Sequence, residues 1–226
     1  MDASRYIAIV LILFAINTFG QDSTLIKNYN QNLLDLVKGT DLERDLISDS
    51  VQFELRLWIC DFFYPDKLIQ LTKDIENIWD YRLGYFKFID TKTTFVFQDS
   101  IKKTIDWDNF KIELDRFINA GLPNQNDIEL TLIKDGKTFR MKNEDYFSSI
   151  MDGGAYTVEI FDNKTHKSIH YNNPESYLEK LKEFGLSTIE HEKIIRFTHY
   201  ITDSFDFRRL QQIQMREIVD CNKNEK

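Results

Sequence analysis

Three acidic side chains occupy positions at which a rigid element would hold a carboxylate in place: Glu54, Asp152 and Glu159. Glu54 and Glu159 lie in stretches where apolar and polar residues alternate, as in a β-strand, and Asp152 precedes two glycines. Two carboxylates on either side of a cleft are the groups that hydrolyse glycosides. A simpler interpretation of Glu54 and Arg56 is a solvated strand face with a cross-strand pair. Acid–base hydrolysis is therefore an alternative rather than the main prediction.

The four histidines lack the spacing of a metal site. His166 and His170 would share a strand face only if both lay in the strand, and His166 falls in a turn-rich segment. His191 begins a His-Glu-x-x-His zinc motif, but Ile195 occupies the position of the second histidine. His191 and His199 are offset by about 80° on an ideal helix. We therefore predict histidines that are exposed or hydrogen-bonded, and no metal site.

Other catalytic and cofactor motifs are also missing. The sequence contains no Gly-x-Ser-x-Gly elbow, no glycine-rich phosphate loop and no dinucleotide fingerprint, and 8 glycines are too few to build one. We predict neither a cofactor nor a catalytic residue set.

The stretch from Asp152 to Gly185 predicts a hairpin followed by a helix. Residues 156–160 alternate between apolar and polar, residues 162–166 are turn-rich, and residues 167–171 return as the partner strand. Pro174 is suited to the first position of the helix that follows. The ends of this hairpin could gather polar groups into a binding site, or the same residues could simply cap turns and pack. The candidate binding residues are Asp152, Tyr156, Glu159, Tyr171 and Asn172.

The pattern Asp152-Gly153-x-x-Tyr156-x-Val158-Glu159, followed by Tyr171-x-Asn173-Pro174, resembles that of small exported bacterial proteins of unknown function. The similarity would extend from about residue 50 to 205. The resemblance implies an α+β domain and a bacterial envelope or secreted location. It implies no active-site residue.

The apolar patterns in the rest of the sequence predict an α+β fold. Four strands with short connections, at 51–60, 67–73, 78–89 and 93–98, predict an antiparallel meander. Ile128 to Met141 predicts a hairpin around Asp135-Gly136. Helices are predicted at 25–37, 107–119, 143–150, 174–184 and 206–219, and one more helix is predicted to begin after a capping box at Ser187. Asp106 is the predicted cap of the helix at 107–119. We expect an antiparallel sheet (meander plus hairpins) of about six to eight strands, with the helices at 107–119 and 174–205 on one face.

The first twenty residues predict a signal peptide. Arg5 provides a positive start, residues 6–16 are apolar, and Thr18 and Gly20 permit cleavage before Gln21. The alternative, an uncleaved anchor, would need about 20 apolar residues. The predicted organisation is a signal peptide at 1–20, a single domain at 21–220 and a flexible tail at 221–226. We expect a secreted or periplasmic protein without a membrane span in the mature chain.

Export affects two further predictions. Cys60 and Cys221 could form a disulfide in an oxidising compartment, or could be two unrelated thiols. Asn163-Lys164-Thr165 is a glycosylation sequon in a predicted loop.

Composition narrows the function. The net charge of −8, without a cluster of Lys and Arg, is unfavourable for binding nucleic acid or anionic lipid. Trp58, Trp79 and Trp107 are expected in the core rather than in a sugar-binding cleft. We predict a non-enzymatic binding or interaction module of the bacterial cell envelope, with a protein or small ligand as partner. The alternative is an exported hydrolase using acidic residues of the sheet.

Overall fold

The computed structural model describes most of the chain from Ser50 onward. The leader at 1–20, nearly all of the helix predicted at 25–37, the helix at 143–150 and the sequon at Asn163 lie outside the described residues. The described residues are 37, 42, 50–61, 64–89, 92–134, 137–142, 154–162, 165–183 and 188–224.

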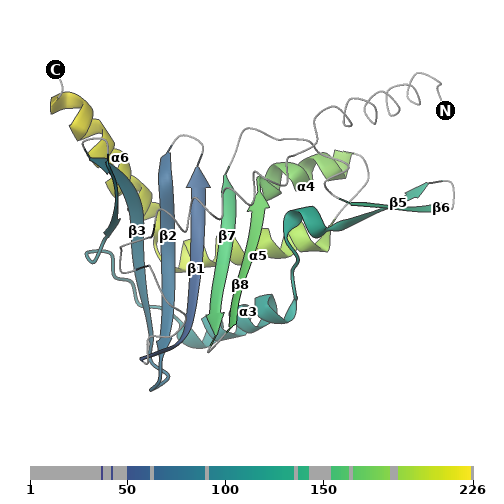
Figure 1. Cartoon of the computed structure of the whole chain (residues 1–226), viewed down its shortest axis with the longest axis horizontal. Helices are drawn as coiled ribbons and strands as arrows, with labels where there is room; N and C mark the ends of the chain where they lie inside the picture. Colours follow the sequence, from purple (N-terminus) through teal and green to yellow (C-terminus); the bar gives the residue numbers. More distant parts are fainter. Residues whose placement is uncertain are drawn as a thin grey trace.

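Six strands form one antiparallel sheet, which confirms the predicted α+β class (Figure 1). The strand order is β4-β3-β2-β1-β7-β8, so the predicted meander makes one part of the sheet and the β7–β8 hairpin joins it beside β1. The strands are β1 (Val51–Asp61), β2 (Tyr64–Asp74), β3 (Trp79–Ile89), β4 (Lys92–Phe97), β7 (Ala155–Asp162) and β8 (Thr165–Asn172).

Alternation along β1 gives the sheet two different faces. Leu55 of β1 pairs with Leu71 of β2 and with Ile160 of β7, and all three are buried. Paired residues in antiparallel strands point to the same face, so these side chains share one face, which we call the helix-covered face. Glu54 and Arg56 point to the opposite one, which we call the second face.

Helices pack on the helix-covered face, as predicted; Figure 1 shows α3 and α5 behind the strands. Burying a large apolar side chain contributes roughly 1.5–3 kcal/mol, so this packing is a main source of stability. The helices are α3 (Trp107–Asn119), α4 (Pro174–Glu183), α5 (Ile189–Ser204) and α6 (Phe207–Asn224). Their core side chains include Phe110, Leu114 and Phe117 of α3, Leu181 of α4, Ile194, Phe197 and Ile201 of α5, and Phe207 and Leu210 of α6.

The hairpin predicted after Ile128 forms, but as a separate two-stranded sheet of β5 (Glu129–Lys134) and β6 (Lys137–Lys142). In Figure 1 it extends away from the main sheet. At the outer edge of β8, two side chains at the start of the short 3₁₀ helix η1 (Gln125–Asp127) bind the backbone of the strand. The Asn124 side chain accepts from the His170 N–H at 3.0 Å, and Gln125 accepts from the Asn172 N–H at 2.5 Å. These contacts satisfy backbone N–H groups at the edge of β8 with which another strand could otherwise pair.

Two helix boundaries differ from the predictions. Thr188 rather than Ser187 is the N-cap of α5, and its hydroxyl oxygen accepts from the His191 N–H at 3.4 Å. Either a serine or a threonine can cap a helix. Thr188 is the cap because its backbone is extended, as an N-cap requires. Helix α6 continues to Asn224, so it includes most of the segment 221–226 that was predicted to be a tail.

The predicted cap of α3 offers a first test. The Asp106 carboxylate accepts from the Asn109 N–H at 3.1 Å. Asp106→Ala should lower the free energy of unfolding by about 1 kcal/mol, because a helix N–H loses its partner. Urea denaturation measures this. Asp108→Ala is the control, since that carboxylate is 93% exposed and pairs with Lys111 on the surface. Equal losses in the two variants would contradict the capping role.

Candidate functional site

The second face of the sheet carries a group of buried charged and polar side chains. Arg56 of β1 lies opposite Gln70 of β2 on one side and Glu159 of β7 on the other, and Glu54 is two residues before Arg56. Their exposed fractions are 1% for Glu54, 3% for Arg56, 4% for Gln70 and 6% for Glu159. We call these four residues the charged cluster.

Arg56 is the positive centre of the charged cluster. Its Nε donates to Glu54 Oε1 at 2.7 Å, and its Nη1 lies 4.0 Å from Glu159 Oε2. Gln70 Nε2 also donates to Glu54 Oε1, at 2.6 Å. One guanidinium therefore balances two buried carboxylates, with the Gln70 amide as an additional donor.

Glu159 has donors on both of its oxygens. Trp58 Nε1 donates to Oε2 at 2.7 Å, and His166 Nε2 lies 3.3 Å from Oε1. Burial alone would raise the pKa of Glu159, but the hydrogen bonds from His166 and Trp58 and the charge of Arg56 together outweigh it. The pKa of Glu159 is therefore lowered from its usual value, and the group is a carboxylate at neutral pH.

This arrangement is unfavourable for acid–base catalysis. A general acid needs a raised pKa, and a general base needs an oxygen that can reach a substrate. Glu159 has a lowered pKa, and both of its oxygens are engaged. Arg56 Nη2 and Gln70 Oε1 are buried, and neither has a hydrogen-bond partner among the described residues. Both atoms have capacity left to bind a polar group.

Aromatic and apolar side chains close off the second face around the charged cluster. The Arg56 guanidinium lies 4.8 Å from the centre of the Phe161 ring, and that ring stacks on His166 at 4.4 Å. Trp58 stacks with Phe86 at 5.9 Å. A second core of Val37, Leu42, Trp58, Leu68 and Phe86 is buried there. The expected solvated face at Glu54 and Arg56 is thus wrong, because this face has a core of its own.

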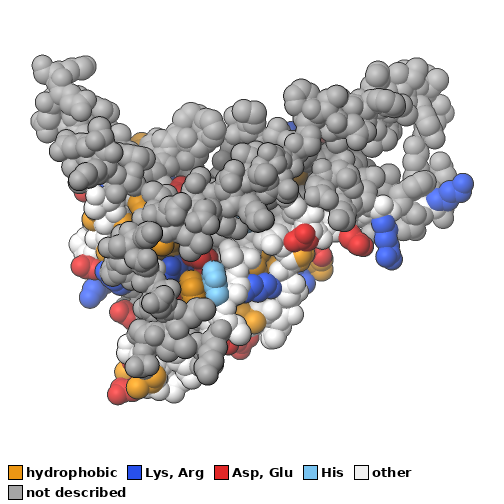
Figure 2. Space-filling view, in the orientation of Figure 1, with side chains coloured by type: hydrophobic (Ala, Val, Ile, Leu, Met, Phe, Trp, Pro, Cys, Tyr) orange, Lys and Arg blue, Asp and Glu red, His pale blue; other side chains and the backbone are white. Residues whose placement is uncertain are grey.

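Where described residues reach the surface in this view, Figure 2 shows a histidine beside hydrophobic and charged side chains. The His166 side chain is 33% exposed, whereas that of its partner Glu159 is 7% exposed. His166 is therefore more accessible to solvent than the carboxylate it contacts.

The structure separates the candidate binding residues predicted from the hairpin. Tyr156 and Tyr171 are cross-strand neighbours on the helix-covered face, and Glu159 points to the second face. The Tyr156 hydroxyl donates to Glu175 at 2.8 Å, and the Tyr171 hydroxyl donates to the Pro123 carbonyl at 3.0 Å.

Burial is the main cause that raises the pKa of both tyrosines well above the usual value. The backbone of Asn172 binds Gln125, as described above, and Asp152 lies outside the described residues. The predicted candidates therefore do not converge on one described site.

Two of the histidines, His170 and His191, are buried. Both are hydrogen-bonded, which is one of the two states predicted for the histidines. His170 Nδ1 lies 2.8 Å from the Thr157 hydroxyl, and His191 Nδ1 binds the Thr188 hydroxyl. The His191 ring stacks on Tyr177 with centres 5.9 Å apart. Burial lowers the pKa of both imidazoles from 6.5 to about 4.

Cys60 is half-buried at the end of β1. The side chain of Cys221 lies outside the described part of the chain, although its backbone belongs to α6. The bridge between them stays a prediction.

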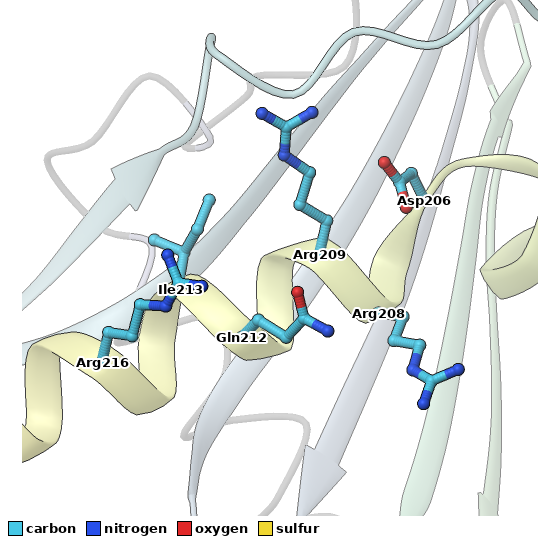
Figure 3. Close-up of a pocket in the computed structure, with 6 residues that line it drawn as sticks. All are labelled: Asp206, Arg208, Arg209, Gln212, Ile213 and Arg216. Carbon is cyan, nitrogen blue, oxygen red and sulfur yellow. The ribbon is translucent and has the colours of Figure 1, made fainter.

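A hollow of about 350 Å³ lies along α6, far from the charged cluster in the sequence. Three of its lining side chains are arginines, and all three are exposed. Figure 3 shows Arg209 and Arg208 extending from different sides of the helix and Arg216 running back toward Ile213. We call this the arginine hollow, lined by Asp206, Arg208, Arg209, Gln212, Ile213 and Arg216.

Sequence reasoning missed the partners of Glu159 and the arginine hollow. The sequence contains a signal for the burial of this strand face but not for the partners: Glu54, Arg56 and Trp58 share one face, and a large apolar ring on a charged face indicates burial. For the hollow, Arg209, Gln212 and Arg216 recur at the spacing of one helix face.

The chain matches no known protein-family model, no curated protein and no solved structure. Among the helices of the described ranges, none is both long and apolar enough to cross a membrane.

Proposed function

We propose that this chain is an exported, non-enzymatic binding or interaction module of the bacterial cell envelope. The observation that carries the proposal is the state of Glu159: it is ionised, buried and bound by Trp58, His166 and Arg56. A side chain so engaged serves to hold β1 and β7 together. The hollow along α6, in contrast, is lined by exposed arginines suited to binding.

The leader predicted at 1–20 supports the exported location, because its positive charge, its apolar run and the small residues before the cleavage position are typical of a signal peptide.

One observation favours the alternative of an exported hydrolase. His166 touches Glu159 and is partly exposed, so a substrate that reached His166 could find a carboxylate behind it.

Expression of the full chain in a bacterial host, followed by fractionation and native mass spectrometry, tests the proposal. We expect protein that begins at Gln21 in the secreted or periplasmic fraction and retains a non-covalent partner or ligand. We also expect no turnover of glycoside and ester substrates. Protein that still begins at Met1 in the membrane pellet would contradict export. Turnover that disappears in a folded Glu159→Gln variant would establish the hydrolase instead.

A further inference from the structure

Helix α6 carries three exposed arginines beside one hollow, and Asp206 is the acidic residue among the described residues that line it. Among the described residues, Arg208, Arg209 and Arg216 form no ion pair with a carboxylate. Arg56, Arg116 and Arg196, in contrast, each bind a glutamate. In a chain whose net charge is −8, arginines without partners stand out as candidates for binding a ligand.

The spacing of the lining residues brings their side chains to a common area. Arg209, Gln212, Ile213 and Arg216 lie at positions i, i+3, i+4 and i+7, which share one face of an α-helix. Side chains on a helix lean toward its N-terminus, so Arg216 leans back over Ile213 and toward Arg209, as Figure 3 shows. About 10 Å separates the two arginine Cα atoms along the helix, a distance that two long side chains can bridge around one small molecule.

The chemistry of the lining identifies the class of ligand. Guanidinium groups bind carboxylates and phosphates through paired N–H donors. A carboxylate has two oxygens and is satisfied by one guanidinium, whereas a phosphate offers three acceptor oxygens and about −1.5 to −2 charges at pH 7. Three arginines and one aspartate leave the lining with a positive charge, which a phosphate-bearing molecule would neutralise.

The size of the hollow favours a small ligand over an extended polyanion. A volume of about 350 Å³ is at the lower end of the range for small-molecule sites. Outside α6, the acidic net charge of the protein would repel a nucleic acid or an anionic membrane. A small soluble anion meets the arginines without approaching the acidic remainder of the surface.

We propose that the arginine hollow binds a small soluble molecule carrying a diphosphate or two phosphate groups. Arg209 and Arg216 hold the phosphate oxygens, and the Gln212 amide, at position i+3 from Arg209, is a further donor in the lining. Arg208 extends from a different side of the helix (Figure 3) and contributes charge. This inference rests on the proposed binding function and specifies the ligand class.

Isothermal titration calorimetry of the full chain with inorganic pyrophosphate tests the inference. We expect saturable binding that weakens about tenfold in Arg209→Gln or Arg216→Gln and more in the double variant, because each loses charge-assisted hydrogen bonds. These side chains are exposed, so the variants should keep the circular dichroism spectrum of the parent. Arg140→Gln is the matched control: it removes the same charge from an exposed position on β6, far from α6 in Figure 1. It should bind pyrophosphate within about twofold of the parent.

Equal affinities in all variants, or citrate bound as tightly as pyrophosphate, would overturn the phosphate site. Binding to phosphatidylglycerol vesicles without binding to pyrophosphate would also overturn it. The result is separable from the proposed function. A protein that retains a partner but ignores pyrophosphate refutes this inference alone, and a protein that turns over substrate while binding pyrophosphate at Arg209 refutes the non-enzymatic proposal alone.

Discussion

Arg56→Met should lower the free energy of unfolding by about 3–5 kcal/mol, because it removes the cation that sits between two buried carboxylates. Glu54 and Glu159 would remain on the second face, 1% and 6% exposed, without the guanidinium that Glu54 contacts at 2.7 Å. Methionine has nearly the same length and apolar character as the arginine stem, so the loss reports charge rather than a cavity. Urea denaturation at pH 7 measures it.

Arg196→Met provides the matched control for Arg56→Met. Arg196 binds both oxygens of Glu113 at 3.0 Å, but its side chain is 66% exposed. Surface ion pairs contribute about 0–1 kcal/mol, so this variant should be nearly as stable as the parent. A triple variant, Glu54→Gln/Arg56→Met/Glu159→Gln, should recover part of the loss because it leaves no unbalanced charge. If Arg56→Met and Arg196→Met cost the same, the charged cluster does not stabilise the sheet.

The protein should lose stability steeply as the pH falls from 7 to 4. The pKa values of His170 and His191 are about 4 in the folded chain, against 6.5 for an unperturbed histidine. Between these values the unfolded chain binds two protons that the folded chain excludes, so acid favours unfolding. Each histidine contributes up to about 3 kcal/mol of loss over this range. The lowered pKa of Glu159 acts in the same direction at still lower pH, because its carboxylate must be protonated there.

Urea denaturation at pH 7, 6, 5 and 4 measures this dependence. His170→Asn and His191→Asn should each flatten the curve by about one proton, although each also loses packing at every pH. His199→Asn is the control, because His199 is exposed and contacts Glu175 on the surface. Its pH dependence should match that of the parent. A parent protein equally stable at pH 7 and pH 5 would contradict neutral buried histidines.

The strands and most helices follow from short-range patterns in the sequence. Residues 51–57 and 156–160 alternate because a strand with one face against a core needs an apolar side chain at every second position. Asp106 could be identified as a cap because the helix stripe begins immediately after it. These signals act within a few residues, so they survive without knowledge of the rest of the fold.

The environment of the second face was not predictable in the same way. Glu54 and Arg56 beside polar neighbours have the pattern of a solvated strand, and only the second core, to which Val37 and Leu42 contribute, makes them buried. The hairpin of β5 and β6 was predicted from its turn, but whether it joins the main sheet depends on the edge of β8, where Asn124 and Gln125 bind the backbone. Local periodicity cannot specify what lies across from a strand.

The candidate sites, too, were predictable in part from local sequence and in part depend on long-range packing. The alternation of residues 156–160 already implied that Tyr156 and Glu159 point to opposite faces, so their separation was available from the sequence. The partners of Glu159 were not, because Trp58 is 101 positions away and meets it only through the register of β1 against β7. The arginine spacing on α6 is visible in the sequence, but the hollow beside it exists only because the helix packs through Phe207 and Leu210 and leaves Arg209 and Arg216 in solvent. Residue spacing determines which side chains share a face, and long-range packing determines whether that face is buried or exposed.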